Sequence, residues 1–225
     1  MKSLLVFFLA AISIKPGLAT FPPNGYTIPE ETLSPSGQYG FTVPSLNDDS
    51  RNVFNSLVSL KSRKIVTQIF APPGFDHSIN YIKIVPPRWS KDESLVLWKV
   101  DGKWIPRALV LIKFDKSQAV WQRNLLSLFQ KKILSYTRTA APKKYERAKQ
   151  WNNGCGPAYP DGFTIDVEES LVSSKKRFID LPLNIHVTLT SDPKKIDGSP
   201  KLESEMDGIV DQNGEIKILN FHLIQ

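Results

Sequence analysis

The chain has 225 residues, of which 41% are hydrophobic and 23% are charged, and its 29 Lys and Arg outnumber its 22 Asp and Glu. This composition supplies enough apolar side chains for a hydrophobic core, and it excludes collagen-like, low-complexity and globally disordered chains. A single cysteine excludes a disulfide framework and a multi-cysteine zinc site. The length suits one large domain or two small ones.

Residues 1–19 have the pattern of a secretory signal peptide. Lys2 precedes an apolar run of eleven residues, and Gly17 and Ala19 are small residues at the two positions that signal peptidase requires. The run is shorter than the roughly 20 residues that span a bilayer. The sequence therefore predicts cleavage before Thr20, an exported protein that is periplasmic or extracellular, and no transmembrane segment after cleavage. A buried N-terminal element is the alternative, although the run has almost no polar face.

The first part of the mature chain is predicted to be a lead-in followed by β-strands. Residues 20–32 are rich in proline, which predicts an extended segment rather than a regular element. Residues 33–115 contain short runs of β-branched and aromatic residues, at positions 38–43, 56–60, 65–69, 94–100 and 103–114. Asp101-Gly102 joins the last two runs, and this dipeptide favours a hairpin because both turn positions adopt positive φ.

Residues 116–152 are predicted to be a basic helical block. Apolar residues recur every three or four positions over residues 118–139, which predicts an amphipathic helix that Asp115 or Ser117 caps and that ends at Pro142. A second short helix is predicted over residues 143–150.

Residues 153–225 are predicted to return to β-structure. Alternating apolar residues over positions 163–168 and 181–190 predict half-buried strands with one solvated face. Asn213-Gly214 is expected to turn residues 208–211 back into a final strand over residues 215–224.

Two segments that lie 56 residues apart form a weak internal repeat. Residues 33–41 and 89–97 each contain an apolar residue, a serine, a polar turn and a strand. Together with the strand and turn at residues 58–64, they resemble the blades of Tol-type and WD-type β-propellers, whose motif is Ser-Pro-Asp-Gly before a strand. Ser36 stands where that motif has Asp, and the second copy lacks both Pro and Gly. The resemblance covers residues 33–114, only two units, whereas a closed propeller has roughly four or more blades.

The predicted fold class is therefore α+β and antiparallel β-rich, with blade-like N-terminal sheets, one helical block and a C-terminal β-meander, and not a closed propeller. Two ordinary hairpin sheets with similar turns are the alternative to blades. Residues 33–225 are compatible with one domain. The layout also resembles exported bacterial proteins of unassigned function, a resemblance that implies no activity.

Cys155 lies in a Cys-Gly-Pro sequence that resembles the nucleophile motif of papain-like peptidases, such as those that trim bacteriocin leaders. The resemblance implies that Cys155 attacks, that Gln150 helps to form the oxyanion hole, that His186 is the base and that Asp192 orients it. The prolines that follow Cys155 oppose the long helix that such a nucleophile begins. A structural turn with a small thiol is the alternative.

The remaining polar residues fit no metal or cofactor motif. His77, His186 and His222 match no metal-ligand spacing, so the sequence predicts neither a metal site nor a cofactor. Paired carboxylates such as Glu168-Glu169, and Glu203 with Glu205, are interpreted as parts of solvated turns and strand ends.

The densest positive charge lies in the helical block, where Glu146 is the only opposing acid and aromatic residues are interspersed. The basic residues are Lys131, Lys132, Arg138, Lys143, Lys144, Arg147 and Lys149. For an exported protein, this surface predicts an anionic envelope polymer or another envelope protein as the partner, rather than nucleic acid. A solvated lysine-rich helix face is the alternative.

The leading hypothesis is an exported, non-catalytic envelope binding or interaction module of unknown biochemical function. One alternative is a cysteine hydrolase that uses Cys155 and His186. Another is a structural subunit of a surface assembly, because unpaired sheet edges invite partners. The sequence favours a protein that is not an enzyme.

The signal-peptide interpretation predicts the N-terminus of the exported protein. N-terminal sequencing of the protein recovered from outside the cytoplasm is expected to begin at Thr20, because signal peptidase cuts after the small residue Ala19. Recovery of an exported protein that begins at Met1 would contradict the prediction.

Overall fold

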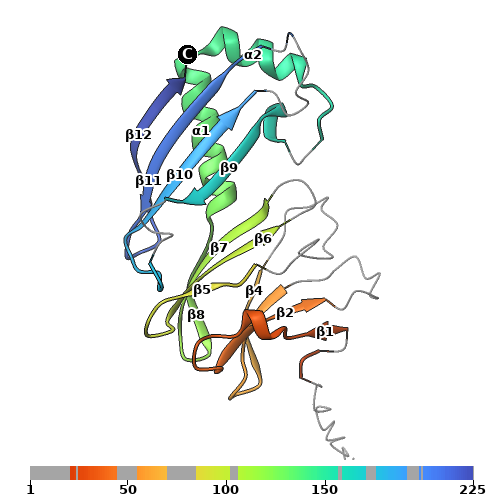
Figure 1. Cartoon of the computed structure of the whole chain (residues 1–225), viewed down its shortest axis with the longest axis vertical. Coiled ribbons are helices and arrows are strands. Elements are labelled where there is room, and N and C mark those ends of the chain that lie inside the picture. The colour runs from red at the N-terminus through yellow and green to blue at the C-terminus, as the bar shows by residue number, and fades with distance from the viewer. Residues whose placement is uncertain are drawn as a thin grey trace, which may run out of the picture.

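The computed structural model describes residues 21–23, 25–44, 55–69, 85–101, 106–156, 159–170, 176–191, 198 and 200–224. These residues form three four-stranded antiparallel sheets and two α-helices, which confirms the α+β, β-rich class. Within them no sheet closes into a barrel or a propeller. The sheets follow one another in chain order along the long axis of the molecule (Figure 1). The predicted signal peptide lies outside the described residues.

The N-terminal sheet consists of four strands in chain order, namely β1 (Tyr26–Thr27), β2 (Tyr39–Pro44), β3 (Asn55–Ser59) and β4 (Lys64–Ile69). The lead-in was predicted to be irregular, but it contributes β1 and a 3-10 helix, η1 (Glu30–Thr32). Thr32 holds this segment against the sheet. Its hydroxyl donates a hydrogen bond to the Phe41 carbonyl and accepts one from the Phe41 amide, each at 3.1 Å.

The middle sheet consists of β5 (Arg88–Trp89), β6 (Leu95–Asp101), β7 (Pro106–Asp115) and β8 (Gln118–Asn124), again in chain order. Strands β6 and β7 pair as predicted, with Asp101 opposite Pro106, although Gly102 lies outside the described residues. The prediction that a helix begins at residue 118 is wrong, because residues 118–124 form β8. Their backbone groups pair with β7, from Gln118 opposite Asp115 to Asn124 opposite Val110, and this pairing overrides the local helical spacing.

The helical block begins at Asn124 instead of Asp115 or Ser117. The side chain of Asn124 accepts a hydrogen bond from the backbone amide of Ser127 at 3.3 Å and so caps α1 (Leu125–Ala140). A second helix, α2 (Pro142–Trp151), follows after a single residue, as predicted to within one residue at each end.

The two central strands of the middle sheet, β6 and β7, are buried on both faces. Leu95, Leu97, Leu109 and Leu111 point into a core shared with α1 and the C-terminal sheet. The alternate residues of the same strands, among them Trp98 and Ile112, point into a second core that includes Phe41 and Leu57 of the N-terminal sheet. Because side chains alternate along a strand, burial on two sides requires an almost unbroken apolar run, and residues 94–100 and 107–114 have such runs.

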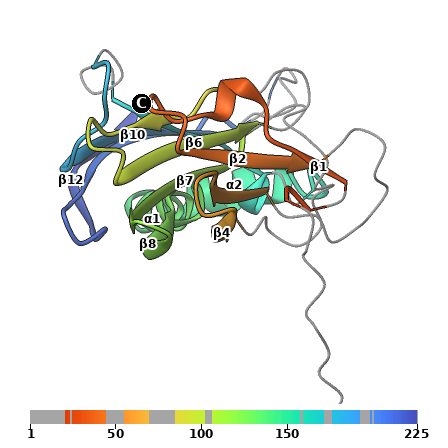
Figure 2. The same ribbon diagram turned by 90° about the horizontal axis from the view of Figure 1, so that it is seen from below.

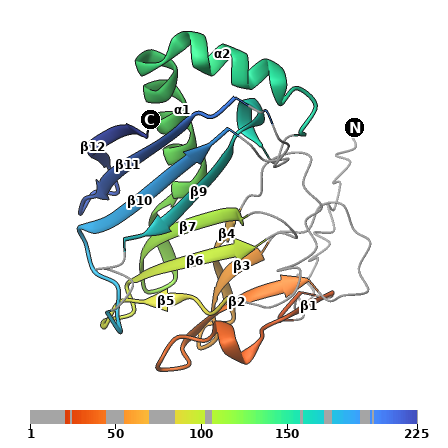
Figure 3. The same ribbon diagram turned by 45° about the horizontal axis from the view of Figure 1, so that its top comes forward.

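The C-terminal sheet is a meander of β9 (Thr164–Glu169), β10 (Leu183–Thr190), β11 (Glu203–Val210) and β12 (Ile216–Ile224), preceded by the 3-10 helix η2 (Pro160–Gly162). Alternate residues of β10 are buried, as the period of two predicted. Helix α1 covers one face of this sheet (Figure 2). Helix α2 lies across the end of the sheet, and the C-terminus lies beside the junction of the helices (Figure 3).

The serines of the two repeated segments form equivalent turns. The Ser34 amide donates to the Tyr39 carbonyl, and the Ser90 amide donates to the Leu95 carbonyl, each at 2.9 Å. The fourth residue of each turn has positive φ, 68° at Gly37 and 56° at Glu93. Glu93 also links the turns, because its carboxylate accepts hydrogen bonds from the Ser34 hydroxyl at 2.9 Å and from the Ser36 amide at 2.7 Å.

An ion pair joins the middle sheet to the C-terminal sheet. Arg88 on β5 donates to the carboxylate of Glu169 at the end of β9, whose side chain is only 8% exposed. The other oxygen of Glu169 is buried and has no hydrogen-bond partner among the described residues. Loss of Arg88 would leave this carboxylate buried and unpaired, which is costly.

The packing of α1 on the C-terminal sheet depends on Gly208. A Cβ atom on Gly208 would lie 2.6 Å from Cε1 of Phe129, which is closer than Cβ atoms approach other heavy atoms in protein structures. We expect Gly208→Ala to lower the free energy of unfolding by about 1–3 kcal/mol in urea titrations, because the added methyl group overpacks the core. The cost should shrink when Phe129 is replaced by Leu. An equal cost in both backgrounds would contradict this explanation.

Candidate functional site: a cationic pocket at the helix junction

The two helices meet at a sharp junction that local sequence explains. Helix α1 ends at Ala140, and Ala141 adopts a non-helical conformation, with φ −141° and ψ 61°. Pro142 then occupies the first turn of α2, where its missing amide hydrogen costs no hydrogen bond. We call this junction, formed by residues 140–144, the elbow.

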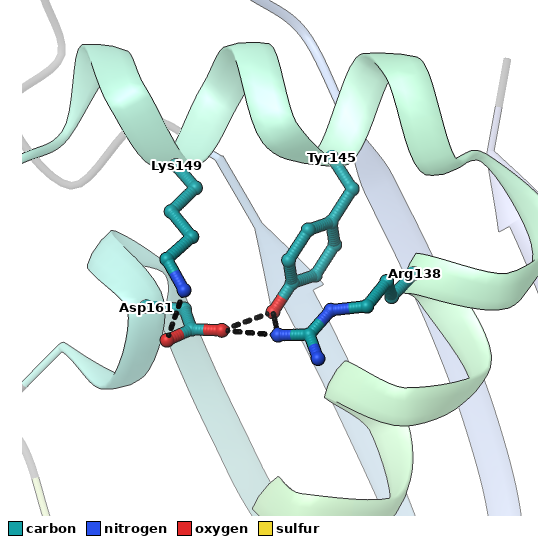
Figure 4. A network of polar contacts seen from close by, with 4 residues as sticks. All are labelled: Arg138, Tyr145, Lys149 and Asp161. Atoms are coloured by element: carbon teal, nitrogen blue, oxygen red, sulfur yellow. Dashed lines mark hydrogen bonds and ion pairs between the residues drawn. The ribbon is translucent and has the colours of Figure 1, made fainter.

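A network of four polar side chains fixes the angle of the elbow (Figure 4). Asp161 of η2 accepts a hydrogen bond from the Tyr145 hydroxyl at 2.6 Å and pairs with Arg138 at 2.8 Å and with Lys149 at 3.0 Å. The Arg138 guanidinium also lies 4.9 Å from the centre of the Tyr145 ring. The network thereby ties α1, α2 and η2 together.

The electrostatics of the network favour an ionised Asp161 and a neutral Tyr145. Burial acts to raise the pKa of Asp161, but the Tyr145 and Lys149 hydrogen bonds and the charges of Lys149 and Arg138 outweigh it, so the pKa lies below its usual value. Burial raises the pKa of Tyr145, and its hydrogen bond to Asp161 raises it further. Tyr145 therefore acts as a hydrogen-bond donor to a carboxylate at neutral pH.

This network changes the predicted basic surface. Sequence analysis assigned Glu146 as the only opposing acid, but Asp161 also opposes the block, because it pairs with Arg138 and Lys149. The contact of Asp161 with the helical block could not be predicted from local sequence, because Asp161 lies outside the block. The five remaining cations, all at least partly exposed, are Lys131, Lys132, Lys143, Lys144 and Arg147.

Two of these remaining cations line a pocket of about 590 Å³ between the elbow and the ends of β11 and β12. Its charged walls are Lys143 and Lys144 from α2, Lys201 from the segment before β11, and Glu203. Its apolar walls are Ala140, Ala141, Pro142, Leu202, Leu223 and Ile224. Glu203 and Ile224 lie opposite each other in the pairing of β11 and β12, so the sheet and the elbow close the pocket together.

The pocket has the electrostatics of an anion site. Its three lysines are exposed, none of them forms an ion pair with another described residue, and Glu203 offsets only one of their charges. The start of α2 and the end of α1 both line this space, so the positive end of one helix dipole and the negative end of the other oppose each other, and the lysines supply the positive potential. Sequence analysis identified Lys143 and Lys144 but missed Lys201, which is distant along the chain.

Among the described candidates for the hydrolase, Gln150 and Cys155 lie at and after the end of α2, whereas His186 lies on β10. Cys155 lies in the turn after α2, at the carbonyl end of a helix, which does not favour an anion. Gln150 is exposed in the last turn of α2. His186 lies on the open face of the C-terminal sheet, where its Nδ1 is 2.9 Å from the Asp207 carboxylate. Asp192 lies outside the described residues.

The open face of the C-terminal sheet carries a cluster of carboxylates. Glu168 and Asp207 lie on either side of His186 in neighbouring strands, and Asp166 and Glu205 lie on either side of Thr188. Burial and the charge of Glu168 raise the pKa of Asp166. The alternation over residues 163–168 predicted the solvated face of β9, whereas the pair Glu203 and Glu205, interpreted from sequence as part of a turn or strand end, lies within β11. In the described part of the chain, no group of three or more His, Cys, Asp or Glu is arranged to hold a metal ion.

A search of protein-family models, of curated proteins and of solved structures found no match to the chain. The described part of the chain contains no helix that is both long enough and apolar enough to cross a membrane.

The ionised Asp161 predicts a pH-dependent stability. Because the folded-state pKa of Asp161 is lowered, its contribution is present above its unfolded-state pKa of about 3.9 and is lost as pH falls through the folded-state value. We expect Asp161→Asn to lower the free energy of unfolding by about 1 kcal/mol at pH 7, a small cost because Arg138 and Lys149 are about half exposed.

Urea titrations at pH 7 and pH 3 test this expectation, and the difference between wild type and variant should shrink at pH 3. Asn is a suitable replacement because it tolerates the positive φ of 53° at this position. Exposed Asp115, replaced by Asn, serves as the control. A difference that is constant with pH would contradict the assignment of charge to Asp161.

Proposed function

We propose that the protein is an exported, non-catalytic binding module whose elbow pocket receives an anionic group of an envelope polymer or of another envelope protein. The observation that carries the proposal is the convergence of Lys143, Lys144 and Lys201 on one pocket. Lysines that face a common cavity bind an anion more tightly than the same lysines spread over a surface, because their fields add.

The rigidity of the elbow supports the same proposal. Asp161 fixes the position of α2 through Tyr145 and Lys149, so the first turn of α2 is held in place before a ligand arrives. A preformed site loses less conformational freedom on binding, and its affinity is higher for that reason. The network thus uses two cations to position the neighbouring pair, Lys143 and Lys144.

The proposal is tested with inorganic polyphosphate as the probe. We expect the double variant Lys144→Ala, Lys201→Ala to bind polyphosphate about tenfold more weakly than wild type in calorimetric titrations, because two charge-assisted contacts are lost. The affinity should also fall as salt is raised.

The matched control removes the same charge elsewhere. Lys61 and Lys64 are exposed on the N-terminal sheet, and their double replacement by Ala should change the affinity less than about twofold. If both double variants lost affinity equally, binding would depend on net charge alone and the pocket would have no special role.

A further inference from the structure

The elbow pocket has an apolar half that a purely ionic ligand would not use. Leu202, Leu223 and Ile224 line the side formed by β11 and β12, and Ala140, Ala141 and Pro142 line the side formed by the elbow. Ile224 is 43% exposed and Leu223 is partly exposed, so these two side chains are open to a ligand, whereas Leu202 is only 3% exposed and belongs to the core. A site that binds only small hydrated ions would have polar side chains at the positions of these apolar residues.

The apolar surface extends beyond the pocket in one direction. Tyr136 lies one helical turn before Ala140 on α1, and Phe221 lies two residues before Leu223 on β12, so each shares a face with a pocket residue. Their rings are 5.5 Å apart, and Tyr136 remains 44% exposed. The helix and the edge strand therefore present a strip of apolar surface that leads away from the lysines.

We propose that the ligand of the elbow pocket is an amphipathic anion. Its phosphate or carboxylate head contacts Lys143, Lys144 and Lys201, and its alkyl chain lies against Leu223 and Ile224 and continues towards Tyr136. The position of the head rests on the proposed function, and the apolar chain is the additional claim. Such a head and chain occur both in a membrane lipid and in a free alkyl anion.

A series of n-alkyl phosphates, from methyl to decyl phosphate and below their micelle concentrations, separates the contribution of the head from that of the chain. For the wild-type protein we expect the dissociation constant to fall roughly fourfold for each added methylene, until the chain leaves the apolar surface. Methyl phosphate, which has a head and almost no chain, should bind most weakly.

Two variants test which pocket residues contact the head of the ligand and which contact its chain. Lys201→Ala should weaken all members of the series by a similar factor, because it removes a contact to the head. Ile224→Ser should flatten the dependence on chain length and leave methyl phosphate unaffected. Leu219→Ser is the matched control, because Leu219 lies on the same strand, is 54% exposed and does not line the pocket.

The outcomes distinguish the two claims. If affinity does not depend on chain length while Lys201→Ala still weakens binding, the amphipathic ligand is wrong and the anion site stands. If chain length matters but Lys201→Ala has no effect, the anion site is wrong. If the wild-type protein binds no member of the series, the amphipathic ligand is also wrong.

Sedimentation with phosphatidylglycerol vesicles distinguishes the source of the ligand. Binding to these vesicles that Lys201→Ala and Ile224→Ser both weaken assigns the site to a membrane lipid. Binding of monomeric decyl phosphate without binding to vesicles assigns it to a free alkyl anion. Both results support an amphipathic ligand, whereas equal binding of all variants to the vesicles would contradict it.

Discussion

The burial of the two central strands of the middle sheet on both faces is the constraint on which the rest of the structure depends. Strands β6 and β7 supply alternate side chains to two cores, one shared with the N-terminal sheet and one shared with α1 and the C-terminal sheet. Because a strand shifted by one residue would exchange the two faces, the register of β6 against β7 must satisfy both cores at once. The position of α1 follows, since it continues directly from β8 of this sheet.

The placement of the elbow is a second consequence of that arrangement. Helix α1 is held by the middle sheet at its start and by the C-terminal sheet along its length, so its last turn has a fixed position beside β12. The ion pairs of Asp161 then set the direction of α2. A cluster of basic residues that looks uniform along the chain is thereby divided into cations that hold the fold together and cations that face a cavity.

Much of the fold could be predicted because the patterns are local. Alternating burial in β10 and the helical spacing inside α1 follow from side-chain period alone. The start of α1 could not be predicted, because Trp121 falls four residues before Leu125 and imitates a helical turn while its backbone pairs with Lys113. The pocket could not be predicted either, since Lys201 and Ile224 reach it only through the pairing of β11 with β12.

The irregularity in the last strand has an effect beyond the pocket. Strand β12 lies at the edge of its sheet, and the bulge opposite Asp207 and Gly208 leaves Leu219 without a cross-strand partner. A kinked edge offers other chains a poor template for continuing the sheet, and the neighbouring charge of Lys217 discourages such growth further. The exposed apolar side chains near the carboxyl end of β12 are therefore less prone to nucleate fibrous aggregates.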